Sequence, residues 1–563
     1  MTEDAAKEDL EKQLTDDVFD VIIVGAGPCG LAVAARLNES VPAAVFTDEE
    51  HRRYQWLRAH GSKVVLKQLR SGRTMSHTRQ VKPRYRIAVL DATANHWMAR
   101  WNGRFETLDI PQLRSPLPWH LDPKDLDSLR GFAHREGRTR ELVEIKGCVG
   151  KELSKHAKKR RQSGRGKAVG PNQNAEINER ERNDYFTASR QLFESHCAFV
   201  QKDYSLAEGL VHHETVTDIT FHPVQATNWD ERLFAVHTNK SCRYARVVVL
   251  AVGPNHKPVF PDFTLDVPRH LEFRGCCDLP QACHSAHIQT IPDALVQARV
   301  DRKLRTNLLV VGGGLTSAQI SDLAIRRGVT KVYHIMRGPC RVKHFDLDLS
   351  WMSKYRNPRL AQFWSADTDT ERLDLIKDAR GGGSLTPTYY KKLLQHQAAG
   401  RLYHQCFTTL TSAKFIPPVE SARDQGGYWQ VETNPPIAEL PRMDYIYFAT
   451  GMPPDFRSFP CLQNLCSQHP LDDIGGLPCL TNQLKWRDDV PLFVTGALAG
   501  LRIGPGAGNL GGARLAAERI ALEIEAMRLG DTIDEDVLPT EKGEAQLRYS
   551  LGLGSKFSAL DIS

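Results

Sequence analysis

The sequence predicts an α/β protein with two parallel sheets, in which the second sheet interrupts the chain of the first. Three observations predict this fold. Two segments, starting near residues 19 and 307, each combine a buried strand, a glycine-rich turn, an apolar helix and a second strand. A further apolar strand near residue 491 leads into another glycine-rich turn and a long alanine-rich helix. Strands that alternate with helices in this way form parallel sheets covered by helices.

The first segment has the elements of a Rossmann unit. Its parts are the strand Phe19 to Val24, the turn Gly25-Ala-Gly27-Pro-Cys-Gly30, a helix over 31–37 and a strand over 43–47 that ends at Asp48. In such a unit the first glycine permits the tight turn, the second admits a pyrophosphate, and the third lets the helix pack closely on the strand. The acid after the second strand accepts a hydrogen bond from an unphosphorylated ribose. The segment therefore predicts a dinucleotide site.

The second segment is a variant of the same unit. Its parts are the strand Leu308 to Val311, the turn Gly312-Gly-Gly314-Leu-Thr316-Ser317, a helix to Arg326, and a strand over 332–336 followed by Arg337. Ser317 replaces the third glycine and is small enough for close packing. Arg337, with Arg341 and Lys343 nearby, stands where the first unit has its acid, and a cation there can pair with a 2′-phosphate. We therefore expect NADPH on the second unit and FAD on the first, although solvated surface charges are the alternative for these cations.

The remaining strands connect the two units. Three apolar strands end in small-residue turns: 246–251 before Gly253-Pro-Asn255, 445–450 before Gly451, and 491–495 before Gly496. The turn after the third strand contains Asn509 and Gly512 and starts a helix whose backbone N–H groups can face the flavin ring or its phosphates. We expect a discontinuous FAD-binding domain, an inserted NADPH-binding domain and a polar tail, which cover 1–300 with 441–530, 301–440, and 531–563 respectively.

The composition is that of a globular protein without a membrane span. Charged residues make up 25%, and the formal net charge is +7, with a basic run inside a disordered-prone insertion over 151–183. Nuclear targeting or polyanion binding is the alternative to a solvated insertion. No apolar run reaches the roughly 18 residues of a membrane helix, and the acidic N-terminus is unlike a signal peptide. The twelve cysteines include no Cys-x-x-Cys pair and no zinc spacing, so we expect a cytoplasmic protein with reduced thiols, no metal and no nucleic-acid partner.

The order of these motifs resembles that of the class B flavin-dependent monooxygenases, and within them the N-hydroxylating, lysine/ornithine N-monooxygenase-like branch. Leu113-Arg-Ser-Pro116 is similar to the Leu-Arg-x-Pro of that branch, and Arg190-Gln-Leu-Phe193 partly matches its Arg-x-Glu-Phe. His284-Ser285 lies between the two glycine loops, where the branch has a His-Ser pair. The stretch Asp346 to Asn357 is similar to an Asp-rich stretch that leads to a substrate-contacting Asn. The resemblance covers about residues 19 to 525.

The resemblance implies a reaction cycle and a set of site residues. NADPH reduces FAD, O2 adds to the reduced flavin as a C4a-hydroperoxide, and a nucleophilic N (or S) of a small-molecule substrate takes the distal oxygen. The residues implied at the NADP or substrate site are Asn255, His284, Ser285 and Asn357. Trp56 is similar to an aromatic residue near the flavin. Loop, cap and core roles are the alternatives for these side chains.

Two departures from the branch bear on the substrate. Its ornithine enzymes place a lysine a few residues before Leu-Arg-x-Pro, where this chain has Leu108, and an acid after the Asn, where it has Pro358. An amino acid needs a fixed charge partner, so we expect the substrate not to be ornithine or lysine. A pyridine-nucleotide oxidoreductase or NADPH oxidase without oxygen insertion, and a regulatory flavoprotein, are the alternative functions. The sequence also leaves a homo-oligomer open.

Overall fold

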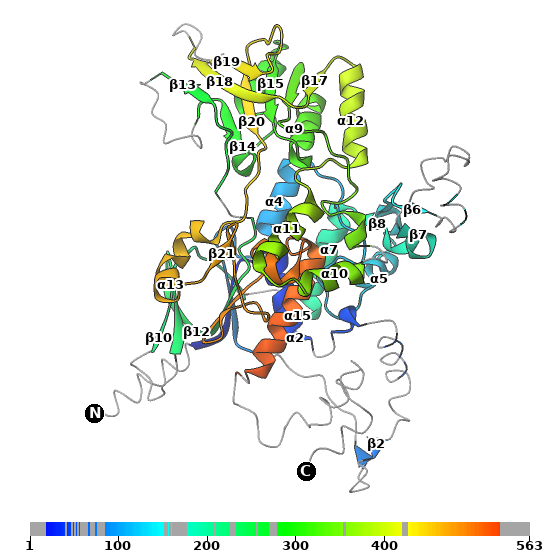
Figure 1. Cartoon of the computed structure of the whole chain (residues 1–563), viewed down its shortest axis with the longest axis vertical. Coiled ribbons are helices and arrows are strands. Elements are labelled where there is room, and N and C mark those ends of the chain that lie inside the picture. Colours follow the sequence, from blue (N-terminus) through cyan, green and yellow to red (C-terminus); the bar gives the residue numbers. More distant parts are fainter. Residues whose placement is uncertain are drawn as a thin grey trace.

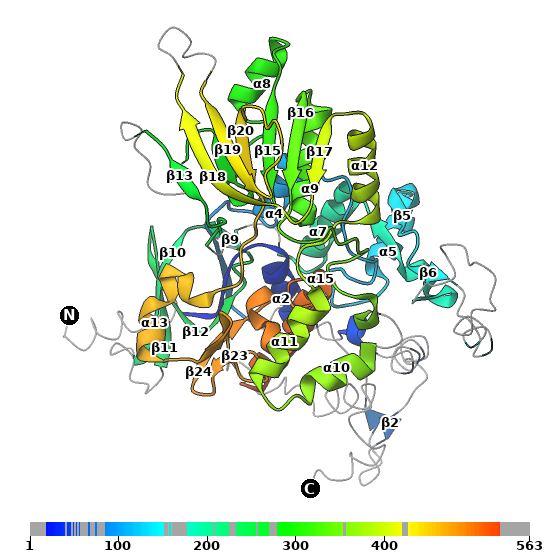
Figure 2. The same ribbon diagram turned by 45° about the horizontal axis from the view of Figure 1, so that its top comes forward.

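Two sheets dominate the part of the chain that the structure describes: a mixed sheet with a parallel centre and a second sheet that is parallel throughout. The structure is a computed structural model that describes residues 18–39, 42–46, 49, 52, 56, 66–67, 74–75, 85–150, 156, 159, 177–206, 209–223, 232–254, 257–268, 279–352, 356–418, 426–527 and 529. In Figures 1 and 2 the two sheets lie one above the other, with helix α4 (Ala99–Thr107) at their junction. The expected mixed α/β architecture is confirmed.

The first sheet has the strand order β10-β11-β12-β1-β4-β9, with β24 and then β23 beside the end of β12. Its strands are β1 (Val18–Val24), β4 (Ile87–Asp91), β9 (Val211–His213), β10 (Val216–Pro223), β11 (Arg232–Thr238), β12 (Cys242–Leu250), β23 (Lys485–Arg487) and β24 (Val490–Val494). Strand β1 pairs in parallel with both β12 and β4, so it lies in the middle of the sheet.

The second sheet is parallel throughout, in the order β14-β20-β15-β16-β17. Its strands are β14 (Ala282–His284), β15 (Asn307–Val311), β16 (Lys331–Ile335), β17 (Leu402–Gln405) and β20 (Tyr445–Phe448). A separate three-stranded sheet, β13-β18-β19, consists of β13 (Thr264–Asp266), β18 (Thr409–Ile416) and β19 (Tyr428–Asn434). Helices α8 (Ala294–Asp301), α9 (Leu315–Arg326) and α12 (Pro387–Ala398) belong to the same part of the chain.

The chain enters and leaves the second sheet at points that differ from the expected limits of 301 and 440. Strand β14 precedes residue 301 and β20 follows residue 440, yet both pair within the second sheet. Strands β23 and β24 then return to the first sheet. The strand expected near 445 therefore belongs to the second sheet, where it pairs with β14 on one side and with β15 on the other.

One expected strand is wrong. Residues 43–45 form a short 3₁₀ helix, η1 (Ala43–Val45), preceded by Pro42. The place beside β1 is taken by β4, with Val24 opposite Leu90. The β-branched and apolar run of β4 buries fully between neighbouring strands, whereas the short alanine-rich segment folds as a turn. The second strand of the first Rossmann unit is therefore β4.

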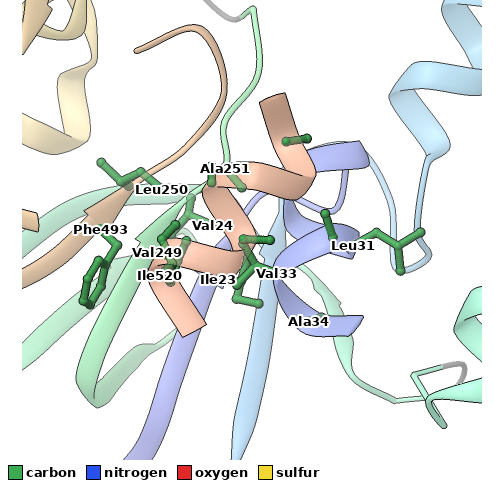
Figure 3. Close-up of a cluster of buried hydrophobic side chains, with 14 of the residues drawn as sticks. Ile23, Val24, Leu31, Val33, Ala34, Val249, Leu250, Ala251, Phe493 and Ile520 are labelled. Carbon is green, nitrogen blue, oxygen red and sulfur yellow. The ribbon is translucent and has the colours of Figure 1, made fainter. Parts of the chain in front are cut away.

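The hydrophobic core beside the first glycine loop contains one helix from early in the sequence and one from late in it. Helices α2 (Pro28–Asn38) and α15 (Leu510–Ala526) lie side by side against β1 and β12. Figure 3 shows Ile23, Val33 and Ile520 converging in this layer. All three side chains are buried. Burying such side chains contributes roughly 1.5–3 kcal/mol each, so the packing fixes the start of both helices.

The other elements surround this framework. They are β2 (Leu66–Lys67), β3 (Thr74–Met75), α5 (Ser128–Arg135), β5 (Leu142–Glu144), β6 (Val149–Gly150), β7 (Ile177–Asn178), β8 (Phe186–Ala188), α7 (Arg190–Asp203), α10 (Arg356–Trp364), α11 (Asp369–Arg380), α13 (Gln463–Gln468), β21 (Asp473–Ile474), β22 (Leu477–Pro478) and α14 (Gly500–Ile503). Helix α11 packs on α14 although it lies between strands of the second sheet in sequence. None of the described helices has the length and apolar character needed to cross a bilayer.

Candidate functional site

The first glycine loop lies at the carboxyl end of β1 and has the close contacts that a Rossmann turn needs. Gly25 has a φ of +111°, and a Cβ there would lie 2.4 Å from the Ala251 carbonyl oxygen. A Cβ at Gly30 would lie 2.1 Å from the carbonyl oxygen of Gly25. Both positions therefore exclude any side chain.

Gly27 differs from its two neighbours in the motif. A Cβ at Gly27 would meet no heavy atom within 4 Å. Gly27 is also the N-cap of α2, and no side chain caps the helix there. The first backbone N–H groups of a helix have no intrahelical acceptor, and the helix dipole favours an anion at that end. The open space at Gly27 and the uncapped end of α2 fit a pyrophosphate.

The acid beside this loop is Asp91, at the end of β4. Its Oδ2 accepts from the backbone N–H of Ala26 at 2.8 Å, and its Oδ1 accepts from Thr93 at 2.7 Å. Asp48, the acid expected from the sequence, lies outside the described residues, and the strand expected to end there is not formed at 43–45. Sequence reasoning missed Asp91 although the run Ile87 to Leu90 before it is the more apolar strand.

The second glycine loop repeats the geometry of the first. Gly312 has a φ of +148°, and a Cβ there would lie 2.3 Å from the Ala449 carbonyl oxygen. Gly314 is the N-cap of α9 and Thr316 lies in its first turn, again without a side-chain cap. Ser317 is buried, and its Oγ donates to the Gly314 carbonyl at 2.7 Å. The serine therefore packs where a third glycine would lie and uses its hydroxyl within the loop.

The three cations near the second loop have different surroundings. Arg337 lies two residues after the end of β16 and is exposed, as is Arg341. Lys343 forms an ion pair with Asp348 at 2.6 Å and donates to the Arg380 carbonyl at 3.0 Å. Arg337 and Arg341 remain candidates for a 2′-phosphate, whereas Lys343 is committed to a structural contact.

The C-terminal turn and helix close against the first loop. Gly496 has a φ of +74°, and a Cβ there would lie 3.4 Å from Cys29 Sγ. A Cβ at Gly512 would lie 2.1 Å from the Gly506 carbonyl oxygen. Asn509 is the N-cap of α15, and its side-chain amide donates to Asp346 Oδ1 at 3.1 Å. Asn509 therefore connects the start of α15 to the Asp-rich stretch.

His284 and Ser285 lie at the junction of the two sheets, where β14 ends. The His284 ring is buried, and its Nδ1 accepts from the backbone N–H of Ala286 at 3.1 Å. Burial, followed by the charge of His287, lowers the pKa of His284 to about 4. Arg104 of α4 donates to the Ser285 carbonyl at 3.3 Å. His284 is thus a neutral capping residue in the structure, and Gly451, with a φ of +89°, lies three residues after the end of β20, the strand beside β14.

The other expected site residues are not gathered at this junction. Asn255 lies outside the described residues. Trp56 is 55% exposed. Asn357 is exposed in the first turn of α10, which packs on α11 and on η7 (Leu349–Trp351). The described residues hold no cluster of His, Cys, Asp and Glu arranged for a metal, and their ten cysteines are free thiols.

Comparison with known proteins adds a family and a fold. Residues 175–453 match the family model of L-lysine 6-monooxygenase/L-ornithine 5-monooxygenase. No curated protein sequence matches the chain at a significant level.

Three solved structures share the fold at low sequence identity. An ornithine N-hydroxylase from Kutzneria sp. 744 is 17% identical with a TM-score of 0.56, covering 91% of this chain and 100% of that one. A cadaverine monooxygenase of desferrioxamine biosynthesis from Erwinia amylovora is 16% identical with a TM-score of 0.53, covering 90% and 95%. An L-lysine 6-monooxygenase from Pseudomonas syringae is 15% identical with a TM-score of 0.52, covering 91% and 100%.

Two sheets, each with a glycine loop at the carboxyl end of a central parallel strand, have the arrangement of a protein that binds two dinucleotides. The family match makes the assignment more specific. Residues 175–453, just under half of the chain, match the lysine/ornithine N-monooxygenase family, an N-hydroxylating branch of the class B flavin-dependent monooxygenases, which are NADPH-dependent flavoprotein enzymes.

Proposed function

We propose that this protein is a cytoplasmic, NADPH- and FAD-dependent monooxygenase that oxygenates a nucleophilic nitrogen of a small amine, with O2 as the second substrate. The observation that carries the proposal is the pairing of two glycine loops of the same geometry in one chain, with an acid beside the first and exposed cations beside the second. Free thiols in the described part of the chain suit a reducing compartment.

FAD would bind to the first loop. The open position at Gly27, the uncapped start of α2 and the carboxylate of Asp91 would receive the pyrophosphate and the ribose. Asp91 would take the role that the sequence predicted for Asp48. The start of α15, with Asn509 and Gly512, would contact the flavin half, because α15 packs beside α2.

NADPH would bind to the second loop. Gly312 and Gly314 would admit the pyrophosphate at the start of α9, and Arg337 would pair with the 2′-phosphate. In this arrangement the second sheet and its neighbours are an NADPH-binding domain inserted into a discontinuous FAD-binding domain. The junction at His284, Ser285 and Gly451 then joins the two.

The protein's own residues would bind, orient and exclude water. FAD, when bound, supplies the hydride acceptor and the activated oxygen. The fully buried His284 ring holds the turn at Ser285 through the Ala286 N–H, and Arg104 fixes the same turn from α4. The neutral His284 imidazole at the end of β14 and Arg104 of α4 hold the turn at Ser285 in one geometry. The nicotinamide and the flavin can then approach each other in a fixed orientation.

The proposed substrate is an amine that has no amino-acid carboxylate, because residue 108 offers no charge to bind one. Leu108 ends α4 and packs against the hydrophobic cluster of the second sheet. An apolar side chain there offers no charge partner, and Arg104, one turn earlier, contacts the Ser285 carbonyl. The Erwinia protein of similar fold, named as a cadaverine monooxygenase, supports a diamine as the first compound to test.

A two-step experiment tests the cofactor assignment. The purified protein is denatured and the released flavin identified by chromatography, and the intact holoprotein is then titrated with NADPH in the absence of oxygen. We expect the released flavin to be FAD. We also expect the oxidised flavin absorbance to fall in proportion to the NADPH added. A protein that holds FAD but is not bleached by NADPH would support a regulatory flavoprotein instead.

A further inference from the structure

Residues 381–384, which we call the strap, lie directly on the second glycine loop. A Cβ at Gly383 would lie 3.0 Å from both the Cα and the N of Gly314, and 3.1 Å from the carbonyl carbon of Gly313. A side chain at residue 383 would fit only if the neighbouring backbone gave way by a few tenths of an ångström, so these close backbone contacts favour glycine. The strap therefore touches the second glycine of the loop, the position at which a pyrophosphate approaches the backbone.

The first glycine loop provides a comparison within the same molecule. Gly27 corresponds to Gly314 in the motif, and a Cβ at Gly27 would meet nothing within 4 Å. The strap thus distinguishes the second dinucleotide site from the first. It follows the C-terminus of α11, where Gly381 is the helix C-cap with a φ of +60° and Gly382 has a φ of +84°.

The strap is joined to the segment that follows Arg337 through Leu385, the residue directly after it. Val342 and Leu385 form a parallel bridge, in which the Leu385 N–H donates to the Arg341 carbonyl at 2.8 Å and the Lys343 N–H donates to the Leu385 carbonyl at 2.9 Å. The Arg341 guanidinium lies beside Gly381, with Nη1 3.0 Å from the position of a Cβ there. The strap therefore connects the pyrophosphate loop to the cations expected at the 2′-phosphate.

A single arginine from the other half of the molecule holds the strap. Arg114, in the Leu-Arg-Ser-Pro motif, donates to Ser384 Oγ at 2.9 Å and to the Ser384 carbonyl at 3.4 Å. It also donates to the carbonyls of the strap's partner segment, at 3.0 Å for Lys343, 3.2 Å for His344 and 2.8 Å for Phe345. No carboxylate in the described part of the chain forms an ion pair with it, and burial lowers its pKa to about 10.

This arrangement is specific to arginine. The planar guanidinium presents its N–H donors in a fixed fork, with Nη2 shared among three of the five acceptors, and these acceptors lie on two segments about 40 residues apart in sequence. A lysine ammonium has three donors on a flexible stem and cannot bridge both segments at once. Arg114 therefore fixes the strap relative to the residues 343–345 and to its own loop before α5.

We propose that the strap forms the outer wall of the NADPH pyrophosphate site and that Arg114 is the positioning residue that seats it there. The inference rests on the proposed function, because it takes the second loop as the NADPH site. It adds that the FAD-side motif Leu113 to Pro116 controls nicotinamide dinucleotide affinity through the strap, without touching the dinucleotide itself.

The test measures NADP+ binding to the FAD-loaded full-length protein by equilibrium dialysis. We expect Arg114→Lys to raise the NADP+ dissociation constant by about tenfold, the loss of one or two hydrogen bonds that position the wall. Gly383→Ala should raise it by about threefold, because the neighbouring backbone must give by a few tenths of an ångström. Its backbone φ needs no glycine, so this variant tests the contact alone. The FAD content of both variants should equal that of the wild type.

Two controls match these changes. Arg401 also donates to three backbone carbonyls of the second domain, those of Ile325, Val329 and Thr330. Arg401→Lys should lower thermal stability without changing the NADP+ dissociation constant. Gly131→Ala, where a Cβ would meet nothing within 4 Å, controls for the glycine substitution.

A second readout follows the strap itself. Trypsin can cleave after Arg380, immediately before the strap. NADP+ should slow that cleavage in the wild type, and Arg114→Lys should speed it and weaken the protection, whereas Arg401→Lys should do neither. If Arg114→Lys and Gly383→Ala both keep wild-type affinity and protection while the wild type binds NADP+, the strap inference is wrong. A wild type that binds FAD but no NADP+ refutes the proposed function, and the strap inference with it.

Discussion

Asp91 accepts a hydrogen bond from the backbone N–H of Ala26, with 2.8 Å between Oδ2 and N. This contact ties the end of β4 to the first glycine loop, although the two residues are 65 positions apart. The other carboxylate oxygen accepts from the N–H groups of Thr93 and Ala94. One side chain thus orders both the loop and the turn that follows β4.

The assignment of Asp91 predicts a difference between two acids. Asp91→Ala should weaken FAD binding by at least about tenfold, because it removes a charge-assisted contact to the loop and the expected ribose acceptor. Asp48→Ala, at the acid first expected from the sequence, should leave FAD binding unchanged. Flavin content after dialysis and FAD titration of the apoprotein measure both. Equal losses, or a larger loss for Asp48→Ala, would return the ribose to Asp48.

The cations after β16 predict the choice of nicotinamide cofactor. Arg337→Ala should raise the Michaelis constant for NADPH by about tenfold or more and leave that for NADH nearly unchanged, since NADH has no 2′-phosphate. Lys414→Ala is the control, because Lys414 of β18 pairs with Asp266 at 2.8 Å and its loss should leave both Michaelis constants unchanged. Initial rates of flavin reduction with each cofactor measure the ratio. An equal effect of Arg337→Ala on both cofactors contradicts the 2′-phosphate assignment.

Gly27 and Gly30 of the first loop predict losses of two different properties, FAD affinity and apoprotein stability. Gly30→Ala places a Cβ 2.1 Å from the Gly25 carbonyl oxygen, so it should destabilise the apoprotein, by about 1–3 kcal/mol or more. Gly27→Ala meets no protein atom and should leave apoprotein stability intact while lowering FAD affinity. Chemical denaturation of the flavin-free proteins, with FAD titration alongside, distinguishes the two. A Gly27→Ala protein that binds FAD as the wild type does would show that no pyrophosphate approaches residue 27.

Glu214, beside Asp91, predicts a pH-dependent term in stability. Its backbone N–H donates to the Asp91 carbonyl, and its carboxylate pairs with Arg243 at 2.6 Å. The Arg243 guanidinium, with the hydroxyls of Thr238 and Ser241, lowers the pKa of Glu214 from 4.5 to about 2. A pKa lowered by folding stabilises the protein above the unfolded value, so this contribution is present above pH 4.5 and is lost as the pH falls towards 2.

Glu214→Gln should therefore be less stable than the wild type at neutral pH, by about 1–3 kcal/mol. The difference between the two unfolding free energies should shrink as the pH falls below 4.5, which denaturation curves over that range can follow. A difference that stays constant with pH would mean that the charge of Glu214 does not matter.

The periodic features of the sequence predicted the framework well. The strands expected over 308–311 and 332–336 formed at Asn307–Val311 and Lys331–Ile335, and the helix ended at Arg326 as expected, because alternation of strand, glycine turn and helix is a local signal. The glycines of both loops make the close contacts expected of them for the same reason. Local patterns of this kind fix which residues can approach the backbone.

Pairing between distant segments could not be predicted in the same way. The run before Asp48 and the run before Asp91 both have an apolar stretch ending in an acid, and only the sheet shows that the second lies beside β1. Strand β20 likewise joins the second sheet through its neighbour β15. The contacts of Arg114 span about 230 to 270 positions and leave no trace in local sequence.

The reaction of the reduced protein with oxygen distinguishes the proposed N-hydroxylating monooxygenase from an NADPH oxidase. The FAD-loaded protein is reduced with NADPH without oxygen, then mixed with oxygen in the presence of cadaverine, ornithine, lysine and other amines in separate reactions. We expect at least one amine to be recovered as its N-hydroxylated product in proportion to the NADPH consumed, with little hydrogen peroxide. We expect no such product from ornithine or lysine. Immediate return of the oxidised flavin with stoichiometric peroxide and no oxygenated product, whichever amine is present, would contradict it and indicate an NADPH oxidase.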